Sequence, residues 1–311
     1  MSGMKYPIEK KLVVGISSNA LFDLTKEDEI FQKEGLEAYR EYQIKKRDVL
    51  LPKGAAFPFV ERFLNINKVY SDEHPVEVVL LSRNSPETGI RIYNSIQRYG
   101  LDIQRAVFTA GESPYPYIPA FNISLFLSTN GEDVRSALEA GFAAGKILKT
   151  NVGEDDNSKE LRLAFDFDGV LADDEAEKVY KEKGLEEYRR YETEHRSIAL
   201  KPGPLADFFK KISYFQKLES EKLEEDPHYT KVLKTAIITA RSAPAHERAF
   251  HTLEEWGVSV DEMFLLGGVE KKRVLEIMKP HLFFDDQLIN LDESMQSIPL
   301  VHIPFGVANN E

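Results

Sequence analysis

The sequence predicts an α/β fold, a parallel sheet covered by helices on both faces, that occurs twice along the chain. Three observations lead to this prediction. Short apolar runs alternate with amphipathic helical patterns, the second half of the chain repeats the first, and the composition is that of a globular protein. The chain has 311 residues, of which 42% are hydrophobic and 30% charged, so it can form two packed units.

Each half shows the order strand, helix, strand, helix, strand. Strands are expected near residues 11–17, 76–82 and 122–128 of the first half and near 161–167, 234–239 and 281–285 of the second. Helices are expected over Glu87–Tyr99, Glu132–Leu148, Ala245–Trp256 and Lys271–Met278. Strands that alternate with helices in this way form parallel sheets.

A longer, mostly helical stretch lies between the first and second strands of each half. In an α/β fold, an insertion at this point lies over the carboxyl ends of the strands, where ligands bind. We therefore expect a small helical cap, at about residues 173–218 in the second half. The polar stretch 151–160 lacks periodicity and is the expected linker between a first unit, 1–150, and a second unit, 161–311.

An internal repeat supports this division into halves. Residues 26–42 superpose without gaps on residues 175–191. The further matches, in the same order along the chain, join residues 78–82 to 235–239 and residues 123–129 to 280–286. Chance similarity would not produce several matches in one order, so the sequence indicates an ancient duplication.

Composition excludes several classes of function. The net charge of −12 argues against a surface for nucleic acid or anionic membranes, because such a surface is basic. There are no cysteines, which excludes disulfides, thiolate catalysis and cysteine-ligated zinc. No apolar run approaches the roughly 20 residues of a membrane span, and the N-terminus lacks the apolar run of a signal peptide. We therefore expect a cytoplasmic protein without membrane or nucleic-acid partners.

Two aspartates, one residue apart, end the first strand of the second half. Alternate residues of a strand share a face, so Asp166 and Asp168 are expected to point the same way. Two like charges so placed favour a divalent cation between them. The alternative is an Asp-Gly turn that merely closes the strand.

The repeat offers an internal comparison for these acids. Asp166 and Asp168 correspond to Ser17 and Asn19, and the aspartate pair at 285–286 corresponds to the Ser-Thr pair at 128–129. The strands occur in both halves, whereas the paired acids occur only in the second. Turn formation would not require this difference at two separate strand ends, so the comparison favours one functional site that contains Asp166, Asp168, Asp285 and Asp286.

Other polar groups converge on the same edge of the predicted sheet. They are the turn Thr239–Ser242 and a lysine, Lys271 or Lys272. Carboxylates suit Mg²⁺, and a hydroxyl with backbone N–H groups at a helix start suits a phosphate. A lysine offsets the charge of a transferring phosphoryl group, and a carboxylate can attack phosphorus. The residues thus predict a phosphoryl-transfer site.

The motifs resemble those of a known superfamily. Asp166-Phe-Asp-Gly-Val170 is similar to the first motif of the haloacid dehalogenase-like (HAD-like) phosphatases, which have a Rossmann-like fold. Ile237-Ile-Thr239, Lys271 and Asp285-Asp286 resemble their second, third and fourth motifs, in the right order.

Within that superfamily the chain resembles the cytosolic 5′-nucleotidase type I family. The stretches that carry the resemblance are 79–88, 111–117, 239–248, 284–287 and 303–307. The resemblance implies Mg²⁺-dependent hydrolysis of nucleoside 5′-monophosphates, AMP among them. The implied partner is a small-molecule nucleotide substrate, and a homo-oligomer is left open.

The resemblance also implies roles for individual residues. Asp166 would be the nucleophile, and Asp168 would be the general acid and base. Mg²⁺ would bind Asp166, the backbone carbonyl of Asp168 and one acid of the 285–286 pair, for which Asp286 is preferred to Asp285. Phosphate oxygens would be bound by Thr239, Ala240 and Arg241, and Lys271 would offset charge. Lys271 is preferred to Lys272 because it fits the family's Gly-Gly-x-x-Lys pattern.

Several alternatives stay open at this point. Arg241 could form an intramolecular ion pair instead of contacting substrate. His246 and Arg248 open the next helix and could simply be surface groups, and the recurrence of Tyr188 and Tyr191 in the first half favours core packing over stacking on a base. The protein could also be a HAD-like phosphatase for another small phosphate ester, or a nucleotide-binding regulator without activity.

Overall fold

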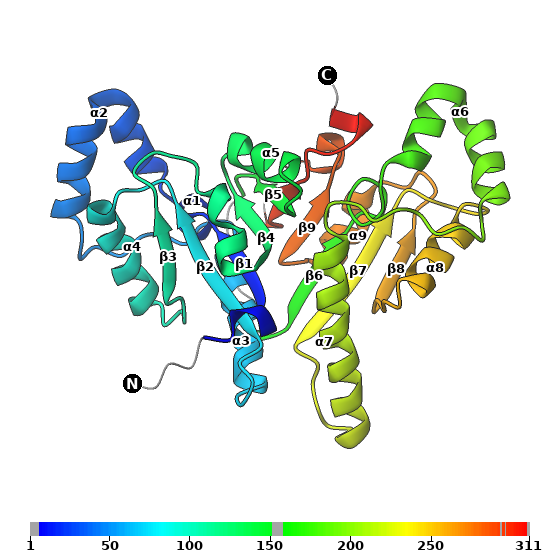
Figure 1. Cartoon of the computed structure of the whole chain (residues 1–311), viewed down its shortest axis with the longest axis horizontal. Helices are drawn as coiled ribbons and strands as arrows, with labels where there is room; N and C mark the ends of the chain where they lie inside the picture. The colour runs from blue at the N-terminus through cyan, green and yellow to red at the C-terminus, as the bar shows by residue number, and fades with distance from the viewer. Residues whose placement is uncertain (1–5, 151–157, 293, 296, 310–311) are drawn as a thin grey trace. The chain divides into compact units, whose positions relative to one another are not determined.

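The computed structural model describes residues 6–150, 158–292, 294–295 and 297–309. The chain divides into two compact units, Met1–Phe142 and Ala143–Glu311 (Figure 1). Each unit is a sheet of mostly parallel strands flanked by helices, which confirms the predicted α/β fold. Among the described residues, no helix combines the length and the apolar character that a bilayer crossing requires.

The first unit has a four-stranded parallel sheet in the order β3-β2-β1-β4. Its strands are β1 (Leu12–Ile16), β2 (Val76–Ser82), β3 (Arg105–Phe108) and β4 (Ile123–Ser128). Its helices are α1 (Ser18–Leu21), α2 (Thr25–Lys45), α3 (Phe57–Val69), α4 (Pro86–Arg98) and α5 (Gly131–Glu139), with short 3-10 turns at Ile8–Lys10, Tyr115–Tyr117 and Pro119–Phe121.

The second unit has the strand order β5-β10-β9-β6-β7-β8, in which only the β5–β10 pair is antiparallel. Its strands are β5 (Ala144–Ile147), β6 (Leu161–Phe165), β7 (Leu233–Thr239), β8 (Glu262–Leu265), β9 (Leu282–Asp285) and β10 (Leu300–His302). Its helices are α6 (Glu175–Glu194), α7 (Ala206–Glu225), α8 (His246–Glu255) and α9 (Lys271–Met278), with 3-10 turns at Leu288–Asn290 and Val307–Asn309.

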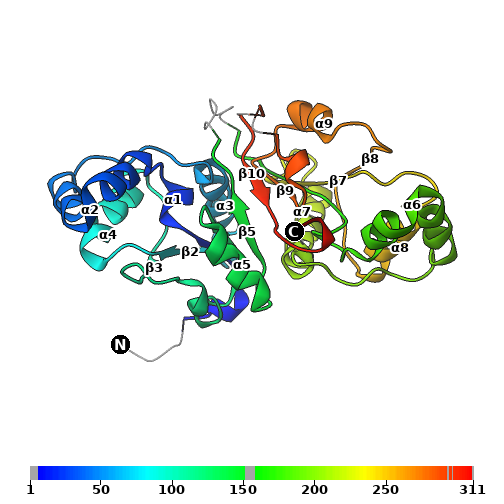
Figure 2. The same cartoon turned by 90° about the horizontal axis from the view of Figure 1, so that it is seen from above.

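Alternate residues of the central strands build two hydrophobic layers, because successive side chains of a strand point to opposite faces. Ala164 and Phe283 pack with Leu275 of α9 on one face. The ring of Phe165 contacts Phe209 of α7 on the other, with centroids 5.2 Å apart. Figure 2 shows α9 and α7 on opposite sides of these strands.

The duplication is visible within each unit taken separately. The order β3-β2-β1-β4 of the first unit reappears as β8-β7-β6-β9 in the second. Both long helices after the first strand are interrupted at matching glycines, Gly35 with φ 86° and Gly184 with φ 82°. This positive φ strains any residue with a Cβ, so glycine is required for the bend.

The boundary between the units differs from the predicted one. It falls at 142/143 rather than at 150, because residues 144–147 form β5 and pair with β10. The predicted helix Glu132–Leu148 therefore ends at Glu139, where Gly141 adopts φ 82° and stops it. Residues 151–157 of the predicted linker lie outside the described residues.

The cap of the second unit is shorter than predicted. The expected range 173–218 contains α6, which lies away from the sheet, but also the first part of α7. Helix α7 covers the sheet instead, with Phe208, Phe209 and Ile212 buried. Its apolar face thus belongs to the core, so the insertion between β6 and the core helix ends before Ala206.

Candidate active site

The carboxyl ends of three neighbouring strands meet at one edge of the second sheet. Strand β6 lies between β7 and β9, and all three run in parallel. Asp166 follows β6 directly, Thr239 ends β7, and Asp285 ends β9, with Asp286 next. Chain segments far apart in sequence are thereby brought to one site, as the strand-end pattern predicted.

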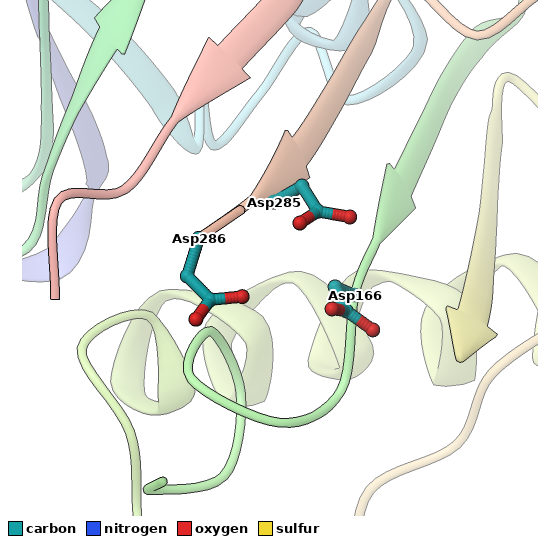
Figure 3. Close-up of side chains that lie close together, drawn as sticks. All are labelled: Asp166, Asp285 and Asp286. Carbon is teal, nitrogen blue, oxygen red and sulfur yellow. The ribbon is translucent and has the colours of Figure 1, made fainter. Parts of the chain in front are cut away.

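Three carboxylates gather at this edge. Asp166, Asp285 and Asp286 are all buried, and each offers an oxygen within 4.8 Å of the others (Figure 3). Lys271, the first residue of α9, lies between two of them, with Nζ 2.7 Å from Asp166 Oδ2 and 2.6 Å from Asp285 Oδ2. The structure thus brings Lys271 into the cluster, whereas the Nζ of Lys272 contacts Asp292 and Ser294.

The two acids after β9 have different surroundings. Besides Lys271, the carboxylate of Asp285 accepts hydrogen bonds from the Gln287 N–H at 2.8 Å and from Asn290 Nδ2 at 3.1 Å. Neither carboxylate oxygen of Asp286 has a hydrogen-bond partner among the residues that the structure describes. Asp286 is therefore the acid whose oxygens are available to a ligand.

Burial dominates the electrostatics of this cluster. It raises the pKa of Asp286 to about 9, with the charges of Asp166 and Asp285 acting in the same direction. It also raises the pKa of Asp166 to about 7, although Lys271 opposes the shift. Buried carboxylates with too few positive partners favour a bound cation or bound protons. The unpartnered oxygens of Asp286 beside Asp166 fit Mg²⁺, which prefers oxygen ligands.

Neighbouring residues restrict the position of Asp286, both at its side chain and at its backbone carbonyl. Gly169 has φ 73°, and a Cβ at this position would lie 2.5 Å from Asp286 Oδ2, so only glycine fits. The carbonyl of Asp286 accepts a hydrogen bond from Asn309 Nδ2 at 2.9 Å and lies 3.0 Å from His302 Nε2. Sequence reasoning missed His302 and Asn309, which flank the family-like stretch 303–307.

Asp168 lies outside the carboxylate cluster and is held by an arginine. Arg241 donates to both of its oxygens, from Nε at 2.8 Å and from Nη2 at 2.7 Å. Of the two alternatives for Arg241, the structure therefore contains the intramolecular ion pair. Thr239 is buried and its hydroxyl accepts from the Arg241 N–H at 3.2 Å, while Ala240 is exposed in the turn after β7.

Arg248 corrects the sequence-based expectation of a surface residue. Its side chain is only 2% exposed and donates from Nη1 to Glu192 at 2.9 Å. Glu192 is completely buried and also binds Arg241. Sequence reasoning missed Glu192 because it belongs to the charged pattern of α6, although the repeat shows a change there, from Gln43 to Glu192.

Of the two cap tyrosines, Tyr191 has a polar as well as a packing contact. Tyr191 donates to Glu175, and its ring stacks on His195 with centroids 4.0 Å apart. Burial raises the pKa of Tyr188; the charge of Arg241 opposes this shift and the charge of Asp168 adds to it. His246 is half-buried rather than exposed.

The corresponding strand ends of the first unit lack this chemistry. Ser17 caps α1 by accepting from the Ala20 N–H at 3.3 Å, a purely structural role. Arg83, in the turn after β2, is neutralised by Asp133 at 2.6 Å. Among the described residues, the group of three ligand side chains at β6 and β9 is the one that could hold a metal ion.

The chain is similar to known proteins. A family model described as 5′-nucleotidase matches residues 4–310. The cytosolic 5′-nucleotidase 1B of Homo sapiens is 34% identical over 287 residues, which cover 90% of this chain and 47% of that protein. The chain thus spans about half the length of this curated relative. No solved structure matches the chain.

Proposed function

This chain belongs to the 5′-nucleotidase family, as its motifs predicted, and on this premise we propose that it hydrolyses nucleoside 5′-monophosphates. The products are a nucleoside and inorganic phosphate, and AMP is among the expected substrates. The observation that carries the proposal is the buried carboxylate of Asp166, which contacts Lys271 at 2.7 Å beside the unpartnered Asp286. Because the human relative is named as cytosolic, we propose the cytoplasm as the site of action.

The proposed reaction passes through Asp166 in two steps. A carboxylate oxygen of Asp166 attacks phosphorus, the bond from phosphorus to the ribose oxygen breaks, and that oxygen takes the proton of Asp168. A water molecule then gives a proton to the Asp168 carboxylate and attacks the phosphorus of the aspartyl-phosphate. The bond from phosphorus to Asp166 breaks, which releases inorganic phosphate and restores both side chains.

The other residues bind and neutralise charge in this proposal. The positive charge of Lys271 offsets the charge that builds on the transferring phosphoryl group. The pKa of Lys271 is raised, because the attraction of Asp166 and Asp285 exceeds the opposing effect of burial, so the lysine stays charged. Thr239 and the N–H group of Ala240 bind phosphate oxygens at the end of β7, and the Arg241 N–H, which donates to the Thr239 hydroxyl at 3.2 Å, orients that hydroxyl.

A divalent cation completes the proposed site. Asp166, Asp286 and the carbonyl of Asp168 would hold Mg²⁺, which when bound supplies a Lewis acid that polarises a phosphoryl oxygen. Asp285 has a different role, since its oxygens are engaged by Lys271, Gln287 and Asn290. It fixes the lysine rather than the cation.

The test is phosphate release from a panel of nucleoside monophosphates and sugar phosphates, with Mg²⁺ and with a chelator. We expect nucleotides to be hydrolysed faster than sugar phosphates, and only with the cation. Asp166→Asn should abolish release, while the control Asp133→Asn, a buried acid of the first unit, should not. Faster release from sugar phosphates would assign another phosphatase activity, and nucleotide binding without release would indicate a regulator.

A further inference from the structure

A chain of buried ion pairs joins the cap helix α6 to Asp168. Arg241 is 1% exposed and binds both oxygens of Asp168, whose side chain is 20% exposed. On its other side the same guanidinium donates from Nη1 to Glu192 and, at 3.1 Å, to the carbonyl of Ala245. Glu192 also accepts from Arg248 of α8 at 2.9 Å. The guanidinium is thus fixed from two sides.

Some contacts of this network recur in the first unit, where they attach the corresponding helix α2 to its neighbour α4. Arg91 is the counterpart of Arg248, and the two make the same contact, from Nε to the carbonyl of Val49 or of Ile198, at 2.9 Å in both units. The side chain of Gln43, the counterpart of Glu192, accepts from Arg91 at 3.2 Å. Gln43 therefore takes the place of Glu192 in this attachment, and the charge of Arg91 is balanced there by Glu27 of the same helix, at 2.5 Å.

Three other residues of the network are all charged in the second unit and all neutral in the first. Asp168, Arg241 and Glu192 of the second unit correspond to Asn19, Asn84 and Gln43 of the first. In the first unit, where the acids of the site are absent, all three charges are absent as well, although Arg91, the counterpart of Arg248, is retained. The charge of Glu192 thus occurs together with the charges of Arg241 and Asp168, whereas in the first unit Glu27 balances the retained arginine.

From this pattern we propose that Glu192 is a positioning residue for Asp168. It fixes the guanidinium of Arg241, which in turn fixes the carboxyl group that exchanges a proton with the ribose oxygen. The inference rests on the proposed hydrolysis of nucleoside monophosphates. It means that the docking of α6 on α8 and the placement of the acid are coupled, because both depend on the same buried carboxylate.

The test uses the isosteric change Glu192→Gln, which copies the residue of the first unit. A misplaced general acid should slow substrates with a poor leaving group, such as nucleoside monophosphates, more than an activated aryl phosphate, whose aryl oxide leaves without taking up a proton. We expect kcat/KM for the nucleotide to fall about 10- to 100-fold and that for p-nitrophenyl phosphate by less than about threefold. The ratio of the two is the readout, because a general loss of structure would lower both.

The matched control is Glu27→Gln in the first unit. Glu27 is a buried acid paired with Arg91 at 2.5 Å, so its replacement should lower stability in a similar way and leave the ratio unchanged. Arg241→Lys provides a second route, since it keeps the charge but loses the two-point contact, and it should shift the ratio in the same direction. In the double variant the effects should not add, because both residues act through Asp168.

An unchanged ratio in both Glu192→Gln and Arg241→Lys would overturn the inference, as would an equal shift in Glu27→Gln. If the wild-type protein released no phosphate from nucleotides but did from the aryl phosphate, the proposed substrate class would be wrong. That result is distinct from a failure of the positioning role, which requires an active wild-type protein.

Discussion

Asp286→Asn should make the metal-free protein more stable. The carboxylate of Asp286 is buried without a partner among the described residues, and its pKa is raised from 3.8 to about 9. A carboxyl with a raised pKa in the folded state favours folding at low pH and opposes it as the pH rises from about 4 to 9. At pH 7, about three units above 3.8, the opposing contribution is at most about 4 kcal/mol.

The asparagine removes this contribution but keeps the shape of the side chain. In the presence of a chelator at pH 7 we expect the variant to melt up to roughly 10 °C higher than the wild-type protein. The difference should vanish near pH 4 and increase toward pH 9. Asp285→Asn is the control of opposite sign, because it removes the charged partner of Lys271 at 2.6 Å and should lower the melting temperature.

The assay is thermal unfolding, followed by circular dichroism, with a chelator and with Mg²⁺ over a range of pH. Added Mg²⁺ should raise the melting temperature of the wild-type protein, because a ligand of the folded state stabilises it, and should raise that of Asp286→Asn little. The reasoning is refuted if the variant melts below the wild-type protein in the chelator at pH 7. It is refuted equally if Mg²⁺ stabilises both proteins to the same extent.

Three further substitutions test the surroundings of the site. Gly169→Ala should reduce phosphate release at least about 10-fold and weaken Mg²⁺ binding measured by calorimetry. The reason is that the added Cβ would lie 2.5 Å from Asp286 Oδ2. Unchanged Mg²⁺ binding would contradict this prediction. Lys271→Met should lower kcat by roughly 100-fold or more in a phosphate-release assay, whereas Lys272→Met, at a half-buried residue outside the carboxylate cluster, should stay within about twofold. Equal losses would contradict the assigned roles. Asn309→Ala removes a 2.9 Å hydrogen bond to the Asp286 carbonyl and should weaken Mg²⁺ binding about 10-fold, and an unaltered affinity would show that the contact is dispensable.

The parts of the fold that the sequence predicts correctly are those set by local pattern. The strands that carry Asp166, Thr239 and Asp285 are buried apolar runs, and such runs are recognisable without any tertiary information. Strands β3 and β8 were missed because they are short and only half-buried, so their pattern is weak. Strand β5 was missed because its alanine and glycine continue the spacing of the preceding helix.

Residues of the site likewise divide into those that local sequence pattern predicts and those that depend on distant parts of the chain. The comparison of Asp166 with Ser17 identified the acids from the sequence alone, because the difference lies at known strand ends. Glu192 was missed because a glutamate in a charged helix usually faces solvent. Its burial depends on Arg241 and Arg248, which lie in a later segment of the chain, so the pairing is visible only in the structure.

The bend at Gly184 folds the two parts of helix α6 against each other. In a straight helix, residues eight positions apart lie about 12 Å apart along the axis. The rings of Tyr180 and Tyr188 nevertheless meet edge to face with centroids 6.1 Å apart, and in the first unit Phe31 and Tyr39 do the same at 5.9 Å. Each of these helices is therefore a helical hairpin whose two arms are joined by a pair of aromatic rings. A single glycine thus gives the helix an internal tertiary contact that a straight helix would lack.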